Sequence, residues 1–271
     1  MLSYFTVCLL INFVQFNKNK KSNTILLTTI LFSFQGLNFK HCTMKKLFIL
    51  FLLQTVAIYA IAQDCQGYFA ASKGTKMEMV SYDKKDKPTT TLKYQVNDIK
   101  SSGNSTIYVV HNETFDSKGR LIGSADMETK CSSGDFYMTF QGMGGEALAK
   151  APDMEVTVTG DQMVYPNTMT AGQKLKDATV NIKSGMKGGM TLMNMTANIT
   201  DRKVEGFETV ETPAGKFDCV KITYTNTFRL MGTRTMKGVE YLAKGVGIVK
   251  SETYDDSGKK QSYMILTKLE K

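Results

Sequence analysis

The chain has 271 residues, with 34 Lys and Arg against 25 Asp and Glu, a formal net charge of +9. Residues 1–62 hold six lysines and no acid, so residues 63–271 carry 28 basic and 25 acidic side chains. This nearly neutral remainder lacks the dense basic stripe typical of nucleic-acid-binding proteins, so we expect no nucleic-acid partner. It keeps a single histidine, His111, which excludes sites with two His ligands; we expect no metal and no cofactor.

Residues 1–43 contain no Asp, Glu, Arg or Pro and precede a second methionine, Met44. We expect them to be a mis-assigned upstream extension without structure, with the natural start at Met44. The alternative is an amino-terminal membrane anchor. Its apolar pieces, Leu2–Phe16 and Thr24–Phe34, are shorter than the roughly 20 residues that a spanning helix needs.

Residues 44–62 have the order of a secretion signal. Lys45 and Lys46 precede an apolar run, Leu47–Leu53, and small residues follow at Ala60-Ile-Ala62. Cleavage is predicted between Ala62 and Gln63. The mature chain would be exported to the periplasm or the outside of the cell, soluble after cleavage and without an integral membrane span.

Residues 63–271 alternate apolar and polar side chains with the period of β-strands. One short segment, Gly145–Lys150, has the pattern of a helical turn. Because helical crossovers are missing, we predict an all-β single domain of mostly antiparallel, strongly curved sheet, a half-barrel or a two-layer sandwich, with at most one or two short helices. The predicted strands are Lys76–Tyr82, Thr90–Lys100, Ser105–Phe115, Leu121–Cys131, Asp135–Gln141, Met154–Thr159, Gln162–Tyr165, Ala178–Lys183, Met190–Thr200, Lys203–Thr212, Asp218–Phe228, Thr233–Leu242, Gly247–Tyr254 and Gln261–Lys268.

Three connections share an aromatic-Asp-x-x-Gly/Asp-Lys/Arg pattern: SYDKKDK at 81–87, TFDSKGR at 114–120 and TYDDSGK at 253–259. Asp side chains bond nearby backbone, and Gly supplies positive φ, so hairpin turns are predicted. Calcium loops are the alternative, but the ligand spacing and closing Glu of an EF-type loop are missing.

Three cysteines remain after residue 62, so at most one internal pair forms, as an exported chain permits. We predict a Cys65–Cys131 disulfide, with Cys219 buried in a strand. The spacing does not fix this pairing. Asp64 before Cys65 argues against lipid attachment at that cysteine.

Methionines gather between residues 138 and 195, including MTLMNM at 190–195. They fit core packing, an apolar ligand groove or, through thioethers, Cu(I) binding. For the groove, the predicted residues are Met186, Met190, Leu192, Met193 and Met195. The glycine-rich run at 184–189 is then either a plain hairpin loop or a flap at the mouth of a cavity.

Candidate catalytic groups are sparse. His111 lies in an ordinary strand pattern, and carboxylate pairs such as Asp255-Asp256 or Glu208 with Glu211 carry no sign of proximity. A carboxylate hydrolase is therefore a remote alternative, and we expect no enzymatic activity.

Two motifs carry a family resemblance: VETPAGKFDCVKI at 210–222 and YLAKGVGIVKSE at 241–252. With DCQGYF at 64–69 and RKVEG at 202–206, they resemble the exported domain-of-unknown-function family 3108, also called TapB-like, of Gram-negative bacteria. Where many members have Trp, this chain has Tyr241, and it has no Trp. The resemblance implies an exported β-rich domain and no known catalytic residues.

Two functions fit these patterns. One is a non-enzymatic envelope protein that holds an apolar small molecule or lipid in a curved sheet. The other is a structural or protein-interaction module, with a filled core and an envelope protein as its partner. A cavity of several hundred Å³ would favour the first.

Overall fold

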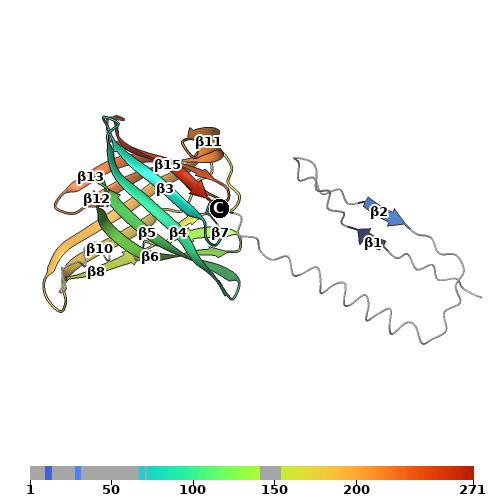
Figure 1. Ribbon diagram of the computed structural model, residues 1–271, viewed down its shortest axis with the longest axis horizontal. Helices are drawn as coiled ribbons and strands as arrows, with labels where there is room; N and C mark the ends of the chain where they lie inside the picture. The colour runs from blue at the N-terminus through green and yellow to red at the C-terminus, as the bar shows by residue number, and fades with distance from the viewer. Residues whose placement is uncertain (1–9, 14–27, 32–66, 71, 141–153) are drawn as a thin grey trace, which may run out of the picture. The chain divides into compact units, whose positions relative to one another are not determined.

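The computed structural model describes residues 10–13, 28–31, 67–70, 72–140 and 154–271 (Figure 1). The chain divides into two units, Met1–Ile61 and Ala62–Lys271. In the first unit, β1 (Leu10–Phe13) and β2 (Thr28–Leu31) pair antiparallel. This pair lies within the segment predicted to be an unstructured extension. The predicted signal, residues 44–62, and its cleavage site lie outside the described residues.

The described residues of the second unit contain thirteen strands in one sheet, and every pairing between neighbours is antiparallel. The all-β prediction of a mostly antiparallel, curved sheet is confirmed. The strands are β3 (Lys76–Asp83), β4 (Pro88–Ser102), β5 (Ser105–Asp116), β6 (Leu121–Ser132), β7 (Asp135–Met138), β8 (Met154–Gly160), β9 (Met163–Tyr165), β10 (Ala178–Met186), β11 (Thr191–Thr212), β12 (Gly215–Arg229), β13 (Thr233–Ala243), β14 (Gly247–Tyr254) and β15 (Lys260–Glu270).

The order of strands shows why this sheet must curl. It runs β8-β10-β11-β12-β13-β14-β15-β3-β4-β5-β6-β7-β9, so β8 and β9 are the two edges. Only Asp161 and Gln162 separate these strands in the chain. Three residue steps span at most about 11 Å, so the two edges of the sheet are held near each other. The sheet is therefore rolled into an open, strongly curved layer, as Figure 1 shows.

The centre of the sheet joins segments that are far apart in the chain. β15 pairs with β3, with Glu270 opposite Lys76 and Ser262 opposite Asp83. Thr267 adds a side-chain bond to the carbonyl oxygen of Glu78, 189 residues away, at 3.1 Å. All other pairings except those of the edge strands follow the chain as simple hairpins.

None of the described residues lies in a helix, and that part of the chain offers no helical segment suited to crossing a bilayer. The predicted helical turn at Gly145–Lys150 falls outside the described residues. The described backbone between strands forms turns and short irregular connections.

The core consists of three clusters of buried hydrophobic side chains. Its largest cluster joins β7 and β9, at one edge, to β10, β11, β12 and β13 near the other. A second cluster lies around β3, β13, β14 and β15, and a third around β4, β5 and β6. Because inward residues come from both ends of the sheet, burying them requires the curl that the β8–β9 link imposes.

Candidate functional site: an apolar cavity and its buried polar neighbour

A cavity of about 200 Å³ lies within the sheet, walled by β3 to β7, β9 and β13 to β15. Nearly all of its lining is aromatic or aliphatic. The lining residues are Tyr68, Phe69, Met79, Leu92, Tyr94, Val110, Asn112, Met127, Thr129, Phe136, Met138, Tyr165, Leu242, Gly247, Ile248 and Met264. Such lining favours an apolar occupant.

Aromatic rings shape one wall of this cavity. Phe69 stacks on Phe136, with ring centroids 4.6 Å apart, and meets Tyr108 at 5.3 Å. Tyr94 donates to the sulfur of Met77, and burial raises the pKa of Tyr94 above its ordinary value. Ring contacts and the Tyr94–Met77 hydrogen bond thus define the shape of this wall.

Polar groups in the lining are few. The Asn112 amide donates one of its two N–H groups to the carbonyl oxygen of Val110 at 3.3 Å. The Thr129 hydroxyl is buried and has no hydrogen-bond partner among the described residues. Thr129 Oγ1 is thus the polar atom of the cavity wall that an occupant could satisfy.

Next to this cavity lies a buried cluster of four polar side chains, Arg202, Glu240, Tyr165 and Tyr224. Arg202 is 1% exposed and Glu240 is 7% exposed. The Tyr165 hydroxyl donates to Glu240 Oε2 at 3.1 Å, and Tyr224 bonds the same carboxyl group. Tyr165 also lines the cavity, so it connects the cluster to the apolar wall.

Arg202 ties β11 to the opposite edge of the sheet. Its Nη1 donates to the carbonyl oxygens of Val164 at 3.2 Å and Lys176 at 2.7 Å, and the guanidinium lies 5.0 Å from the Tyr165 ring centroid. Val164 belongs to the edge strand β9. Together with the Tyr165–Glu240 bond, this contact holds β9 against β11 and β13 across the concave side.

A β-bulge turns Arg202 inward. Register shifts between Thr200 and Lys203, where Asp201 has a φ of 54°. Without the extra residue, the alternation that buries Ile199 would send Asp201 inward and Arg202 outward. The bulge restores a buried position for Arg202 and, two residues later, for Val204, which is 0% exposed.

A glycine makes room for Tyr224 on the neighbouring strand. Gly238 lies directly opposite Tyr224 in the β12–β13 ladder. A Cβ at residue 238 would lie 2.2 Å from Tyr224 Cζ, far closer than atoms pack. The Tyr224 ring therefore lies flat over the backbone of β13, which directs its hydroxyl to Glu240.

Burial sets the protonation of this cluster. Desolvation raises the pKa of Glu240, and the positive charge of Arg202 with the two tyrosine hydroxyls offsets part of that rise. The pKa of Tyr165 is raised, first by burial and then by the Glu240 charge. Two nitrogens of Arg202, Nε and Nη2, have no hydrogen-bond partner among the described residues.

We interpret the role of the cluster as structural, because its hydrogen bonds to the backbone and to the tyrosines connect strands across the sheet.

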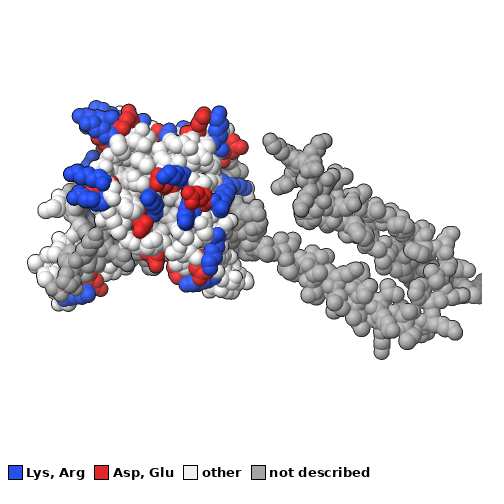
Figure 2. Space-filling model, in the orientation of Figure 1, with Lys and Arg blue, Asp and Glu red and all other residues white. Residues whose placement is uncertain are grey.

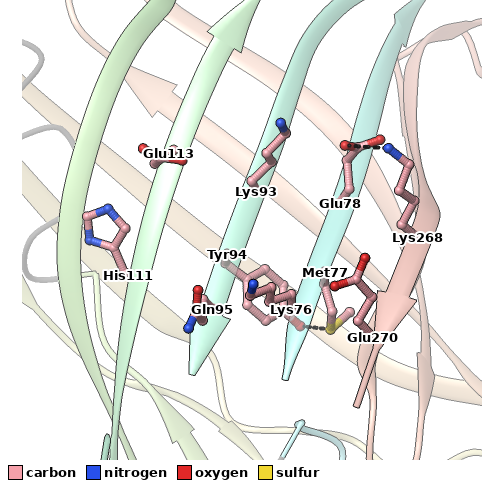
Figure 3. Close-up of a pocket in the computed structure, with 10 residues that line it drawn as sticks. All are labelled: Lys76, Met77, Glu78, Lys93, Tyr94, Gln95, His111, Glu113, Lys268 and Glu270. Atoms are coloured by element: carbon pink, nitrogen blue, oxygen red, sulfur yellow. Dashed lines mark hydrogen bonds and ion pairs between the residues drawn. The ribbon is translucent and has the colours of Figure 1, made fainter. Parts of the chain in front are cut away.

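The opposite, outward face of β15, β3, β4 and β5 has a different character (Figure 2). A shallow depression there is lined by two rows of charged and polar side chains (Figure 3). One row runs Glu113, Lys93, Glu78 and Lys268, each directly opposite the next across the strands. Signs alternate along it, so neighbours attract and the face has little net field.

The second row explains the one histidine after residue 62. His111 lies opposite Gln95, which lies opposite Lys76 and then Glu270. On its other side, His111 Nδ1 is 2.7 Å from Asp126 Oδ1. This half-exposed pair on a solvated face has no nucleophile at its side other than Ser124 Oγ at 3.5 Å, so we assign it to the charged ladder.

The predicted methionine groove has its residues on the β10–β11 hairpin. Met186, Met190 and Leu192 are 52%, 71% and 55% exposed, whereas Met193 and Met195 are half-buried. None of the five lines the apolar cavity described above. The structure thus places these five residues on one hairpin. Their role in ligand binding stays a prediction.

The cysteines are partly described. Cys131 is buried and disulfide-bonded, whereas Cys65 lies outside the described residues, so the Cys65–Cys131 pairing stays a prediction. Cys219 is a free thiol buried in β12, as expected.

The carboxylate pairs have structural partners. Asp255 anchors its own turn, Glu208 is 3.6 Å from Lys221, and Glu211 is 3.4 Å from Lys216. Among the described residues, no three His, Cys, Asp or Glu side chains gather in a way that could hold a metal ion.

Comparison with known proteins gives a family and two solved relatives. The DUF3108-like family matches residues 72–266. A putative exported protein with a YmcC-like fold from Bacteroides fragilis is 29% identical, with a TM-score of 0.62, covering 75% of this chain and 98% of its own. A putative lipoprotein from Parabacteroides distasonis is 26% identical, with a TM-score of 0.64, covering 76% of this chain and 100% of its own. No curated protein matches the chain.

Proposed function

Since the chain belongs to the DUF3108-like family, we propose that it is an exported, non-enzymatic protein that holds an apolar or lipid-like ligand in its curved sheet. The observation that carries this proposal is the apolar cavity of about 200 Å³ on the concave side. Its walls come from nine strands, and Phe69 and Phe136 stack at 4.6 Å in one of them.

Size and lining favour a slender hydrocarbon group. Ligand sites for drug-sized molecules usually measure about 300–1,000 Å³, so this cavity suits a narrower group such as part of an acyl chain. Flexible side chains at Met79, Met127, Met138 and Met264 line it, and thioethers adapt to chains of varied shape. The unpartnered Thr129 hydroxyl offers one point for a polar atom of the ligand.

Export is proposed from the sequence and supported by relatives. Residues 44–62 have the order of a cleavable signal, with the cut after Ala62. The two solved relatives are described as a putative exported protein and a putative lipoprotein. We place the mature chain in the periplasm or outside the cell, as a soluble protein, with Asp64 disfavouring lipid attachment at Cys65.

Adjacent valines on β5 allow a matched test. Val110 lines the cavity, whereas the side chain of its neighbour Val109 points to the other face of the sheet. Val110→Phe should fill the cavity and weaken binding of a fluorescent fatty acid by about tenfold or more, while Val109→Phe leaves it unchanged. Native mass spectrometry of the untreated protein should show an added mass that organic extraction removes and Val110→Phe lacks. Equal fatty-acid binding by both variants, or a bare polypeptide in the spectrum, would reject the proposal.

A second function is supported by the strand edges. Among the described residues, β8 pairs only with β10, and β9 only with β7, so within that part of the chain each has one side on which another strand could add. In this view the protein is an envelope interaction module, and the cavity is a packing gap smaller than most ligand sites. A protein that carries no ligand and whose stability rises on filling the cavity with Val110→Phe would favour this function.

A further inference from the structure

Five turns lie at one end of the sheet, and we call them the turn rim. They join β10 to β11, β12 to β13, β14 to β15, β3 to β4 and β5 to β6, at residues 187–190, 230–232, 255–259, 84–87 and 117–120. Alternate turns of an antiparallel sheet fall at the same end, and the register confirms it: Thr196 lies opposite Arg229, and Ser262 opposite Asp83. In Figure 1 the rim runs along the left side of the sheet, from the β3–β4 turn at the top to the β10–β11 turn at the bottom.

The rim collects the exposed apolar side chains of the domain. Eight large hydrophobic residues are exposed among the described residues, and seven of them lie in a rim turn or within two residues of one. Met231 is 99% exposed and Met190 is 71% exposed; only Phe207 lies elsewhere. The seven are Leu121, Ile122, Met186, Met190, Leu192, Leu230 and Met231. Exposure of this kind, gathered at one end, marks a contact surface.

The same end is basic. The rim turns with two flanking residues on each side hold ten Lys or Arg and five Asp, whereas the rest of residues 63–271 holds 18 basic and 20 acidic residues. Three of these aspartates, Asp83, Asp116 and Asp255, accept backbone N–H groups within their own turns. Asp116 also pairs with Arg120 at 2.6 Å, so these aspartates offset part of the positive charge, and the rim keeps an excess of five basic residues. In Figure 2 blue side chains cluster at the upper left, over the β3–β4 end of the rim.

Apolar tips beside basic turns fit one kind of partner. Strand order places the two apolar tips, β10–β11 and β12–β13, next to each other on the rim, and the three Asp-anchored basic turns follow. Apolar side chains such as Met231 and Leu230 leave water when they enter the boundary between headgroups and acyl chains, which lowers the free energy. The Lys and Arg side chains nearby remain in contact with anionic headgroups. A nucleic acid would contact the basic side chains, but it would not bury the five exposed Met and Leu side chains at the tips.

We propose that the turn rim docks on an anionic lipid membrane, with the β12–β13 and β10–β11 tips entering the surface and the basic turns holding headgroups. This surface differs from the apolar cavity, because none of the cavity-lining residues lies in a rim turn or within two residues of one. Docking by the rim and occupancy of the cavity are separable properties of the protein.

The absence of Trp from the chain supplies a clean probe. Met231→Trp places a single fluorophore on a rim tip, and Phe207→Trp places one on a 60% exposed site away from the rim. With vesicles of phosphatidylglycerol and phosphatidylethanolamine, the indole emission of Met231→Trp should move to shorter wavelength and be quenched by brominated lipid. The emission of Phe207→Trp should change little. Because both variants keep residues 44–62, any membrane binding by that apolar segment affects them alike.

Charge is tested in the same background. Replacing Lys84, Lys85, Lys87 and Lys259 by Gln in Met231→Trp should weaken vesicle binding by at least about tenfold, as four surface charges imply. Phosphatidylcholine vesicles should give a comparably weak response. The proposal is overturned if the emission of Met231→Trp does not shift, if that of Phe207→Trp shifts equally, or if the Gln variant binds as tightly. It is also overturned if soluble DNA binds the rim in place of vesicles.

Discussion

Individual charged residues show most clearly what the sequence pattern conceals. The sequence analysis predicts burial for neither Arg202 nor Glu240, yet both are buried and hold an edge strand in place. A partial signal is present for Glu240, since it alternates with Gly238 and Leu242 on an inward face. Arg202 has no such signal, because a strict period of two assigns it to the outer face and only the bulge at Asp201 reverses that.

Glu240 should give the protein a distinctive pH dependence. Its pKa is raised in the folded state, so the folded protein binds a proton more tightly than the unfolded chain. Stability from this group is present at low pH and falls as pH rises above the ordinary carboxyl pKa of about 4.3. Glu240→Gln keeps an acceptor for Tyr165 but cannot titrate.

The measurement compares free energies of unfolding by urea at pH 5 and pH 8. Raising the pH should lower the stability of the wild-type protein relative to Glu240→Gln. Glu113→Gln, on the solvated outer face, serves as the control and should follow the wild type at both pH values. Parallel changes in the wild type and Glu240→Gln would contradict the assignment.

Strands and turns are largely predictable, since alternation and turn residues are local signals. The three turns with the shared pattern are hairpin turns, each with a positive φ three residues after the Asp, at Asp86, Gly119 and Gly258. The main difference is β11, which the sequence predicts as two strands and the structure shows as one of 22 residues. The pattern breaks at residues 201–202, whereas ladder pairing with β12 continues past them through a bulge.

Glycines in two of these turns should carry stability. Gly119 and Gly258 have φ values of 76° and 81°, a region that costs side-chain-bearing residues about 1–2 kcal/mol. Gly119→Ala and Gly258→Ala should each lower the free energy of unfolding by about 1 kcal/mol. Gly232, in the β12–β13 turn, has no neighbour within 4 Å and no positive φ, so Gly232→Ala is the control. The expectation fails if all three variants lose the same stability in chemical denaturation.

At the scale of the whole molecule, the sequence predicted the class of fold but not the position of the site. Curvature and antiparallel pairing followed from strand patterning without helices. The position of the cavity could not be predicted in this way, because residues from nine strands line it. Along each strand, these residues show the same alternation of apolar and polar side chains as any strand with one buried face. Methionine clustering indicated the β10–β11 hairpin instead, since composition reports apolar residues but not whether the chain brings them to a core or an end.

Redox state should affect the domain as a whole. Cys131 is disulfide-bonded, and reducing a native disulfide typically costs an exported domain about 2–5 kcal/mol. Cys219 should be inert, because burial raises its pKa to about 11 and keeps the thiol protonated. Reductant should lower the melting temperature of the wild type and Cys219→Ser equally. A disulfide-linked peptide containing Cys131 should identify Cys65 as its partner. An unchanged melting temperature, or rapid labelling of Cys219 in the folded protein, would contradict this account.

The pairing of β3 with β15 governs when this protein is able to fold. Nearly the entire domain lies between these two neighbouring strands, so the middle of the sheet stays open until residues 260–270 are available. Contacts between such distant segments make folding slow. For the export proposed above, this means that the chain stays unfolded while it crosses the membrane, and that the sheet is completed only after β15 has reached the far side.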